Sequence, residues 1–128
     1  MRILFDTHAL IWFLTDSKKL PKKVRSLLLS PDSELYFSSV SILEVAIKHS
    51  LKPEHMPCSP EEIRGDSYAS HIRELPFASG HAQMTSRLPW FHRDPFDRML
   101  VAQAMSEGMK LLSHDDQVMR YGECVFGF

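Results

Sequence analysis

The sequence contains little cysteine and no long apolar run. Its two cysteines, Cys58 and Cys124, are far apart and form no CxxC spacing, so neither a disulfide framework nor a thiolate zinc site is expected. No segment approaches the roughly 18 apolar residues that a membrane span needs. The N-terminal MRILFDTHA has an aspartate where a secretory signal would be apolar. We therefore expect a cytoplasmic protein that does not associate with membranes.

Neither sign of charge dominates the chain. The formal net charge is -1 over 128 residues, which excludes a protein that is basic throughout but says nothing about local patches. One basic segment, KKLPKKVR, spans residues 18–25. Such a run is typical of a solvated helix face, and it could also follow an RNA backbone, so both interpretations stay open.

The length and the 44% of hydrophobic residues suit one compact domain over residues 1–128. Short apolar segments predict strands at Arg2–Phe5, Leu35–Ser38, Ile72–Phe77, Lys110–Ser113 and Cys124–Phe126. Helical periodicity and start signals predict helices at Ala9–Leu14, Pro21–Leu29, Ile42–Leu51, from Ser59-Pro60 onward, Ser79–Arg87, Pro95–Glu107 and Asp116–Tyr121. Strands that alternate with helices predict an α/β fold, a three-layer α/β/α domain with a central, mainly parallel sheet.

Several acidic residues follow the predicted strands closely. Asp6 comes directly after the first strand, and Asp115 and Asp116 come directly after the fourth. Glu44 lies in the helix after the second strand, and Asp97 lies in the first turn of the helix before the fourth. Because the carboxyl ends of parallel strands line the ligand crevice, we expect these acids near one edge of the sheet.

Helix capping offers a simpler explanation for each acid taken alone. Asp94 suits an N-cap, with Pro95 as the first helical residue and Asp97 in the first turn. The segment Ser41-Ile42-Leu43-Glu44 has the pattern of a capping box, and Ser113-His114-Asp115-Asp116 resembles one. Capping does not predict, however, that the elements carrying these acids all open toward one sheet edge.

A site shared by several carboxylates requires a cation. Glu44 stands among apolar residues in SILEVAIK, where burying a carboxylate is costly unless it is paired or bound to a cation. Ionised carboxylates close together raise each other's pKa unless a positive charge neutralises them. Oxygen ligands favour Mg²⁺ or Mn²⁺ over zinc. The predicted chemistry is hydrolysis of a phosphodiester or phosphoryl bond, because such an ion lowers the pKa of its bound water and neutralises charge on the phosphate.

Four segments together resemble a known family: ILFDTHALIWFL, SILEVAIK, HRDPFDRMLVAQA and LLSHDDQVMRY. They resemble PIN-domain ribonucleases, specifically the VapC-like toxins of bacterial type II toxin-antitoxin pairs. The resemblance runs almost end to end and keeps the order of the motifs, and HRDPFDRMLVAQA is its most specific part. It implies a PIN-like fold, metal-dependent endoribonuclease activity on an RNA substrate, a cognate antitoxin as partner, and a homodimer.

The resemblance also assigns the site. It implies that four catalytic acids hold one or two Mg²⁺ or Mn²⁺ ions, namely Asp6, Glu44, Asp97 and Asp115. Asp97 is preferred to Asp94 because it stands at the family's fixed distance before LVAQA, which leaves Asp94 as a capping or auxiliary acid. Asp115 is preferred to Asp116 because it takes the acid position of the family's pattern of small hydroxyl, any residue, acid.

Further residues are expected around this site. The hydroxyls of Thr7 and Ser113 would hold carboxylates or metal-bound water. Arg93 and Arg98 are candidates for contact with phosphate, although Arg98 could equally pair with a neighbouring acid. Three histidines match no zinc-binding spacing and are expected as polar groups at the rim of the crevice: His8, His92 and His114.

Two segments depart from the family pattern. SILEVAIK lacks the aromatic residue that is common just before the glutamate, and HSLKPEHMP lacks the glycine that usually follows that helix. The first departure could alter packing and the second the loop near the substrate groove. Neither removes an acid, so activity is still expected.

Three other functions compete with the nuclease. A haloacid-dehalogenase-like phosphatase would need a second aspartate two residues after the first, whereas His8 stands there. A receiver domain would need an acidic pair after the first strand and a lysine after a late strand. A catalytically silent PIN-like module that binds RNA or protein usually lacks one or more of the acids, and all four are present here.

Overall fold

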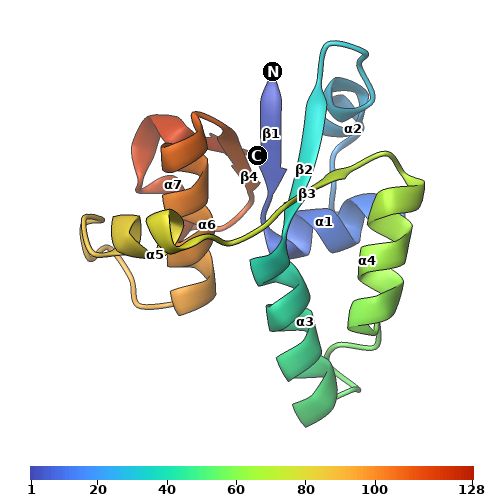
Figure 1. Ribbon diagram of the computed structural model, residues 1–128. Coiled ribbons are helices and arrows are strands. Elements are labelled where there is room, and N and C mark those ends of the chain that lie inside the picture. Colours follow the sequence, from blue (N-terminus) through green and yellow to red (C-terminus); the bar gives the residue numbers. More distant parts are fainter.

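Five parallel strands form a single sheet in the order β3-β2-β1-β4-β5 in the computed structural model, which describes residues 1–128. The strands are β1 (Arg2–Phe5), β2 (Glu34–Ser38), β3 (Arg73–Leu75), β4 (Lys110–Ser113) and β5 (Val125–Gly127). The central strand β1 pairs with β2 on one side and with β4 on the other (Figure 1). Its last residue therefore lies in the middle of the carboxyl edge of the sheet.

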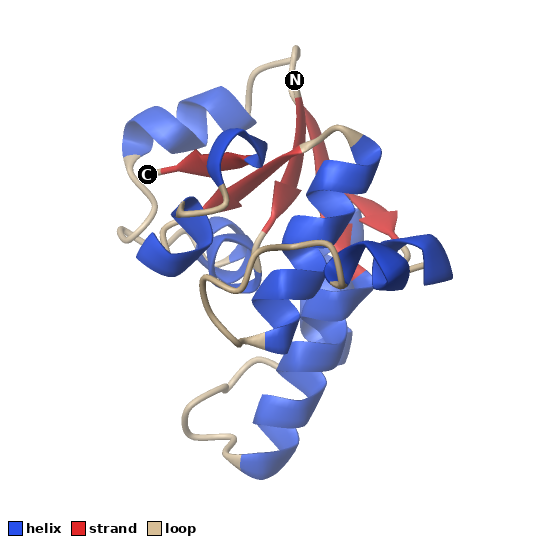
Figure 2. Cartoon of the chain, turned by 90° about the vertical axis from the view of Figure 1, so that its left-hand side faces the viewer, coloured by secondary structure: helices blue, strands red, loops and turns tan.

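Helices connect the strands and cover both faces of the sheet (Figures 1 and 2). They are α1 (Thr7–Leu14), α2 (Lys22–Leu28), α3 (Ser39–Leu51), α4 (Pro60–Ala69), α5 (Ser79–Thr85), α6 (Pro95–Glu107) and α7 (Asp116–Met119), with a 3-10 turn η1 (Gly122–Cys124). Helix α3 projects beyond the carboxyl edge of the sheet, alongside α4 (Figure 1). None of the helices combines the length and the apolar character that crossing a membrane requires.

Side-chain alternation in β1 divides the core into two halves. Ile3 and Phe5 point to one face, where they pack with α1, α2 and α4. Leu4 points to the other face, where it packs with α6. All three side chains are fully buried. The sheet is thus sandwiched between helical layers, as the alternating pattern in the sequence predicts.

Helix α6 begins and ends at the predicted residues. The Asp94 side chain accepts hydrogen bonds from the backbone N–H groups of Phe96 and Asp97, at 2.9 and 3.1 Å, and Pro95 is the first helical residue. Gly108 ends the helix in the left-handed conformation, with φ of 65°. Helix α4 likewise begins with the capping box predicted at Ser59.

The capping box predicted at Ser41–Glu44 is wrong. β2 leads directly into α3, and Ser38 caps the helix by accepting a hydrogen bond from Val40 N at 3.0 Å. Ser41 and Glu44 therefore lie inside the helix, where Glu44 points to a different partner. The box-like segment Ser113–Asp116 also differs from the pattern, because Asp115 itself caps α7.

Candidate metal centre

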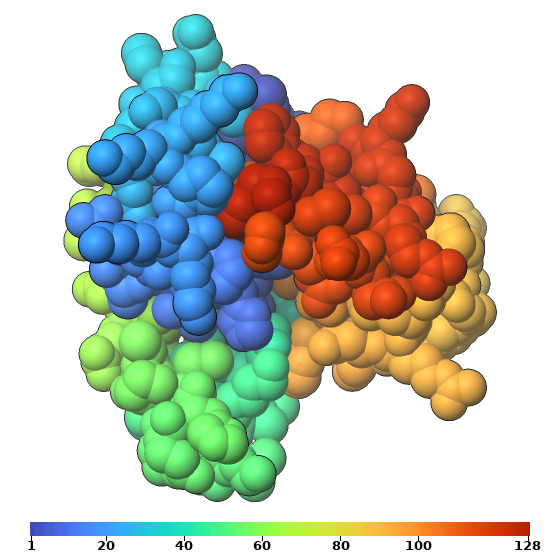
Figure 3. Space-filling view, turned by 180° about the vertical axis from the view of Figure 1, so that it is seen from behind, coloured from blue at the N-terminus to red at the C-terminus, as the bar shows by residue number.

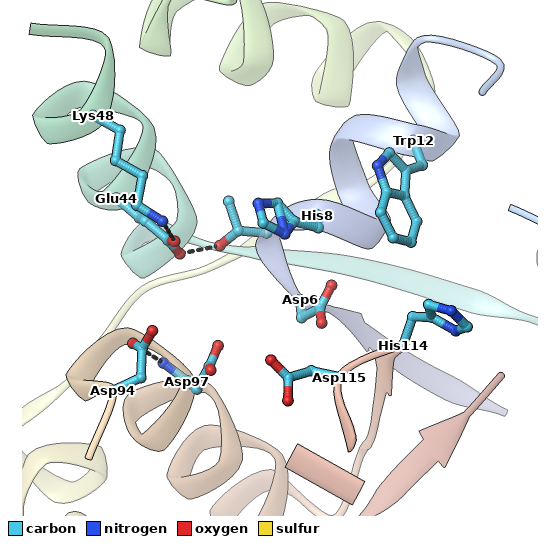
Figure 4. A pocket seen from close by; sticks show the side chains of 10 residues that line it. Asp6, His8, Trp12, Glu44, Lys48, Asp94, Asp97, His114 and Asp115 are labelled. Carbon is cyan, nitrogen blue, oxygen red and sulfur yellow. Dashed lines mark hydrogen bonds and ion pairs between the residues drawn. The ribbon is translucent and has the colours of Figure 1, made fainter. Parts of the chain in front are cut away.

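A pocket of about 240 Å³ lies at the carboxyl edge of the sheet (Figure 4). Ten residues line it: Asp6, Thr7, His8, Trp12, Glu44, Lys48, Asp94, Asp97, His114 and Asp115. Half of them are acids, and Trp12 is the one apolar side chain. Since a water molecule takes up about 30 Å³ in the liquid, the pocket has room for a hydrated ion and a phosphate group. Seen from behind, the molecule is notched between the α3–α4 arm and its C-terminal third (Figure 3).

The five acids reach this pocket from four parts of the chain. Asp6 follows β1 and Asp115 follows β4, and the backbone N–H of Asp6 donates to the β4 residue Leu112 at 3.0 Å. Glu44 reaches it from α3, and Asp97 from the first turn of α6. The structure therefore brings together all four acids that the sequence assigns to one site, with Asp94 beside them.

Three of these acids are also helix caps. The Oδ1 atom of Asp6 accepts a hydrogen bond from Ala9 N at 2.7 Å, and Oδ1 of Asp115 accepts one from Gln117 N at 2.7 Å. Asp94 caps α6 in the same way. Capping and a shared pocket are thus compatible explanations, since a cap uses one carboxylate oxygen and leaves the other. The N-termini of α1 and α6 also present partial positive charge that offsets some of the repulsion among the acids.

Glu44 has a cationic partner within its own helix. Its side chain is buried, and Oε2 lies 2.5 Å from the ammonium of Lys48, one turn further along α3. The hydroxyl of Thr7 donates to Oε1 at 2.6 Å and lies 3.0 Å from the hydroxyl of Ser41. Lys48 was not predicted as a site residue, although its spacing of four residues from Glu44 is the signal that could have found it.

Asp97 has no cationic partner of this kind. Burial, together with the nearby charges of Asp94 and Asp115, raises the pKa of its carboxyl group from 3.8 to about 6, while the hydrogen bond and the charge of His92 oppose the rise. The His92 Nε2 atom lies 3.2 Å from Oδ2 of Asp97. On the other side of its ring, His92 Nδ1 lies 2.9 Å from the hydroxyl oxygen of Tyr121.

Burial also raises the pKa of Asp6 above its usual value. Hydrogen bonds from Ser113 and from the backbone of Ala9 oppose this rise, while the charge of Glu44 adds to it. The ionised forms of Asp6 and Asp97 are thus both disfavoured by their surroundings. A cation in the pocket would stabilise both ionised forms without protonating either of them.

The donor set fits a hard divalent cation. No group of three or more His, Cys, Asp or Glu side chains is already arranged to hold a metal ion, because the caps and the Glu44–Lys48 pair direct several oxygens elsewhere. The carboxylate oxygens of Asp97 and Glu44 accept hydrogen bonds from side chains and none from the backbone. The pocket supplies oxygen ligands of negative charge, which are those that Mg²⁺ and Mn²⁺ prefer.

The remaining predicted residues fall into two groups. Ser113 is fully buried beside Asp6, and its hydroxyl accepts a hydrogen bond from Asp115 N at 3.1 Å. Thr7 holds Glu44, as described above. By contrast, Asp116 and Arg93 are exposed residues outside the lining of the pocket.

Arg98 is not available to contact phosphate, contrary to the prediction. Its side chain is buried, and its guanidinium donates to the carbonyls of Thr85, Leu88 and Pro89 and to the hydroxyl of Tyr121. Its planar group also stacks on the ring of Trp90, 3.7 Å from the ring centre. Arg98 therefore holds the loop before α6 in place, and neither phosphate nor an acid pairs with it.

Of the three histidines predicted at the rim, two line the pocket and His92 does not. His8 and His114 line its rim together with Trp12, whose ring contacts both of them (Figure 4). His92 lies behind the pocket wall and bonds to Asp97. The basic segment at residues 18–25 places its lysines at the surface, whereas Arg25 pairs with Asp16 and donates to backbone carbonyls.

Comparison with known proteins identifies the fold. The PIN domain family matches residues 3–123, whereas no curated protein matches significantly. A chain of VapBC2 from Rickettsia felis, solved bound to a DNA fragment from its promoter, is 13% identical with a TM-score of 0.70, over 100% of this chain and 99% of that one.

Two further complexes contain chains of the same fold. A chain of a toxin-antitoxin complex from Klebsiella pneumoniae is 18% identical with a TM-score of 0.65, over 97% of this chain and 95% of that one. A chain of VapBC-1 from nontypeable Haemophilus influenzae is 16% identical with a TM-score of 0.63, over 94% and 92%. At these identities the likeness establishes the fold. The match to the family spans nearly the whole chain and confirms the resemblance read from the motifs: this chain belongs to the PIN domain family.

Proposed function

We propose that this protein is an endoribonuclease that hydrolyses RNA phosphodiester bonds with the help of Mg²⁺ or Mn²⁺, and that it is the toxin of a type II toxin-antitoxin pair. The observation that carries the nuclease proposal is the convergence of five carboxylates on one pocket. Helix capping accounts for Asp6, Asp94 and Asp115 singly. It does not account for Glu44, which lies inside α3, or for Asp97, whose side chain caps nothing.

The proposed ligands are Asp6, Glu44, Asp97 and Asp115. When bound there, Mg²⁺ or Mn²⁺ would provide a water molecule of lowered pKa and would neutralise negative charge on the phosphate. The oxygen donors come from four separate parts of the chain, which the sheet edge brings to one pocket. Because the backbone is already ordered at this edge, metal binding has only to orient the carboxylate side chains.

The chain's own residues have distinct tasks around these ligands. Thr7 holds one oxygen of Glu44 by its hydroxyl hydrogen bond. Lys48 pairs with the other oxygen. It is the one lysine or arginine that lines the pocket, so it is placed to contact the phosphate of a substrate. The aromatic ring of Trp12 lies at the rim, where it would shield one side of a bound phosphate from water and strengthen electrostatic interactions there.

The toxin role is supported by the complexes with which this chain shares its fold. The chains compared come from toxin-antitoxin and VapBC complexes, and each is covered almost in full. We therefore propose a cognate antitoxin protein as partner. The homodimer is proposed on the motif resemblance alone. Co-expression with the protein encoded by a small upstream reading frame should suppress RNA cleavage, and a purified complex should contain both chains.

The decisive experiment incubates purified protein with total RNA, with and without Mg²⁺ or Mn²⁺, and maps the cut ends. Cleavage at defined sites that a chelator abolishes is the expected result. Cleavage that persists in excess chelator would contradict the metal dependence. Absence of cleavage with either ion, for protein that binds the ion, would instead favour the catalytically silent module.

The receiver-like alternative loses support from the topology. Receiver domains have a parallel sheet of order 2-1-3-4-5, whereas this sheet has the order 3-2-1-4-5. The first strand is followed by Asp6, Thr7 and His8 rather than by an acidic pair. We therefore retain hydrolysis, rather than phosphotransfer to the protein, as the chemistry of this pocket.

A further inference from the structure

A chain of hydrogen bonds runs from Arg98 through Tyr121 and His92 to Asp97. The Arg98 Nη1 atom lies 2.9 Å from Tyr121 Oη, and Tyr121 Oη lies 2.9 Å from His92 Nδ1. The chain ends where His92 Nε2 lies 3.2 Å from Asp97 Oδ2. Apart from Asp97, none of these residues lines the pocket, so the chain approaches the carboxylate from behind.

The Arg98 end of this series of hydrogen bonds is rigid. Arg98 is 4% exposed, and its two terminal nitrogens donate to three backbone carbonyls as well as to Tyr121. A guanidinium has donors and no acceptor, so Tyr121 Oη must accept from it. The direction of the first hydrogen bond is thereby fixed by chemistry.

That direction sets the proton positions along the rest of the chain. Because Tyr121 Oη accepts from Arg98, its own proton is free to go to His92 Nδ1, which is its one remaining partner. His92 then carries its ring proton on Nε2 and donates it to Asp97 Oδ2. The opposite tautomer would place a lone pair of His92 Nε2 against a carboxylate oxygen.

We propose that His92, with its tautomer fixed by Tyr121, is the positioning residue for Asp97. It holds Oδ2 against the wall and leaves Oδ1 to face the pocket as a ligand with a single donor oxygen. The other acids are held by backbone N–H groups or by Thr7 and Lys48. Asp97 is the pocket acid whose carboxylate is oriented by a histidine, and this inference rests on the metal site of the proposed function.

The first test measures Mn²⁺ affinity by titration calorimetry on the full chain. His92→Leu should weaken binding by about 10–100-fold, the usual cost of removing a group that orients a metal ligand. His92→Gln should restore most of the affinity, because its amide offers an N–H near the position of Nε2. Tyr121→Phe should give a loss smaller than that of His92→Leu, since Tyr121 acts only through the ring.

Tyr68→Phe is the matched control. It removes a tyrosine hydroxyl that bonds to Glu74 at 2.6 Å, on α4 and outside the pocket lining. Mn²⁺ affinity should be unchanged in this variant. In the RNA assay, raising the Mn²⁺ concentration should restore cleavage by His92→Leu, which general damage to the fold would not allow, and melting curves report any such damage directly.

The second test reads the tautomer without metal or activity. Long-range ¹H–¹⁵N correlation spectra of the imidazole rings distinguish Nε2–H from Nδ1–H, and the signals absent in His92→Gln identify His92. An Nε2–H ring in the wild type that becomes mixed in Tyr121→Phe is the expected result. An Nδ1–H ring in the wild type would overturn the proposal.

The outcomes separate this inference from the proposed function. If the wild type binds Mn²⁺, Asp97→Asn does not, and His92→Leu binds as the wild type does, the positioning role is wrong and the metal site stands. If neither the wild type nor Asp97→Asn binds Mn²⁺, both the metal site and the positioning role fall.

Discussion

The two walls of the pocket neutralise their buried carboxylates in different ways. On the α3 wall, Glu44 is paired with Lys48 and hydrogen-bonded to Thr7. On the α6 wall, Asp97 faces the acids Asp94 and Asp115, and a histidine is its one hydrogen-bond donor. One wall thus carries a lysine ammonium, whereas the other places only a histidine against three acids.

This difference indicates where an added cation has the greatest effect. Burying like charges is costly, and on the α6 wall that cost falls on Asp97, whose pKa is raised to about 6. On the α3 wall a metal ion has to compete with an ammonium group already in place. The affinity for a metal ion should therefore depend most on the α6 wall, and the predictions below test this difference between the walls.

The largest effect is expected for Asp97→Asn. The variant should lose at least about 100-fold in metal-dependent RNA cleavage, because charge stabilisation by a bound ion amounts to several kcal/mol and each 1.4 kcal/mol is a factor of ten. Its melting temperature without metal should not fall, since the change removes a charge repelled by its neighbours. The matched control is Asp116→Asn, an exposed acid outside the pocket, and cleavage by Asp97→Asn at the control's rate would refute the assignment.

The second effect is a pH dependence of stability in metal-free protein. The pKa of Asp97 is 3.8 unfolded and about 6 folded, so the folded state binds more protons between these values. Stability contributed by protonated Asp97 is complete below about pH 4 and lost as the pH rises through about 6, a change of up to about 3 kcal/mol. The pKa of Asp6 is also raised in the folded state, so this residue contributes to the loss of stability with rising pH in the same direction.

Urea titrations in a chelating buffer at pH values from 4.5 to 7.5 measure this slope. Asp97→Asn should reduce this slope to the part that Asp6 contributes, because the amide does not titrate. A wild-type protein whose unfolding free energy rises over the same range would show that the carboxylates of the α6 wall do not repel one another as described.

Metal binding should reverse this loss at neutral pH. Mn²⁺ at one hundred times its dissociation constant should raise the free energy of unfolding by about 2.7 kcal/mol, provided that the unfolded chain does not bind it. Thermal melts at pH 7.5 over a range of Mn²⁺ concentrations give this value. The increase should vanish in Asp97→Asn, and equal stabilisation of both proteins would place the ion elsewhere.

A smaller effect is expected for Lys48→Met, which removes the built-in cation of the α3 wall. Without metal the variant should lose about 1 kcal/mol or less, because Lys48 is partly exposed. Stabilisation by Mn²⁺ should become larger than in the wild type, since Glu44 then lacks a competing partner. Lys52→Met, a change of the same kind outside the acidic pocket, serves as the control, and no gain in Mn²⁺ affinity for Lys48→Met would remove the contrast between the walls.

The smallest effect is expected for Arg93→Ala. Arg93 is exposed and does not line the acidic pocket, so its proposed contact with phosphate would act from the edge of the substrate. We expect a loss of about threefold or less in kcat/KM, within the range of a surface charge. Measurements at low and high salt would show the loss only at low salt, because solvent ions screen such contacts.

Much of the site was predictable from residues that have local reasons for their places. The strand-to-helix junctions placed Asp6 and Asp115 at the sheet edge, and Pro95 and Gly108 fixed the ends of α6. Arg98 was misjudged because its neighbours in sequence are acids while its partners in space are carbonyls before the helix. Ser41 was misjudged because the junction of β2 with α3 lies three residues earlier than the box suggests.

The sequence by itself determined that this protein has alternating strands and helices and that acids stand at helix starts, because capping, periodicity and apolar runs depend on neighbours along the chain. Only the tertiary structure decided that Glu44 and Lys48 line the same pocket as Asp97 and that His92 and Tyr121 stand behind Asp97. The physical reason is that hydrogen bonds and charge repulsion depend on distance in space. That distance is set by the packing of α3 and α6 at the ends of the sheet.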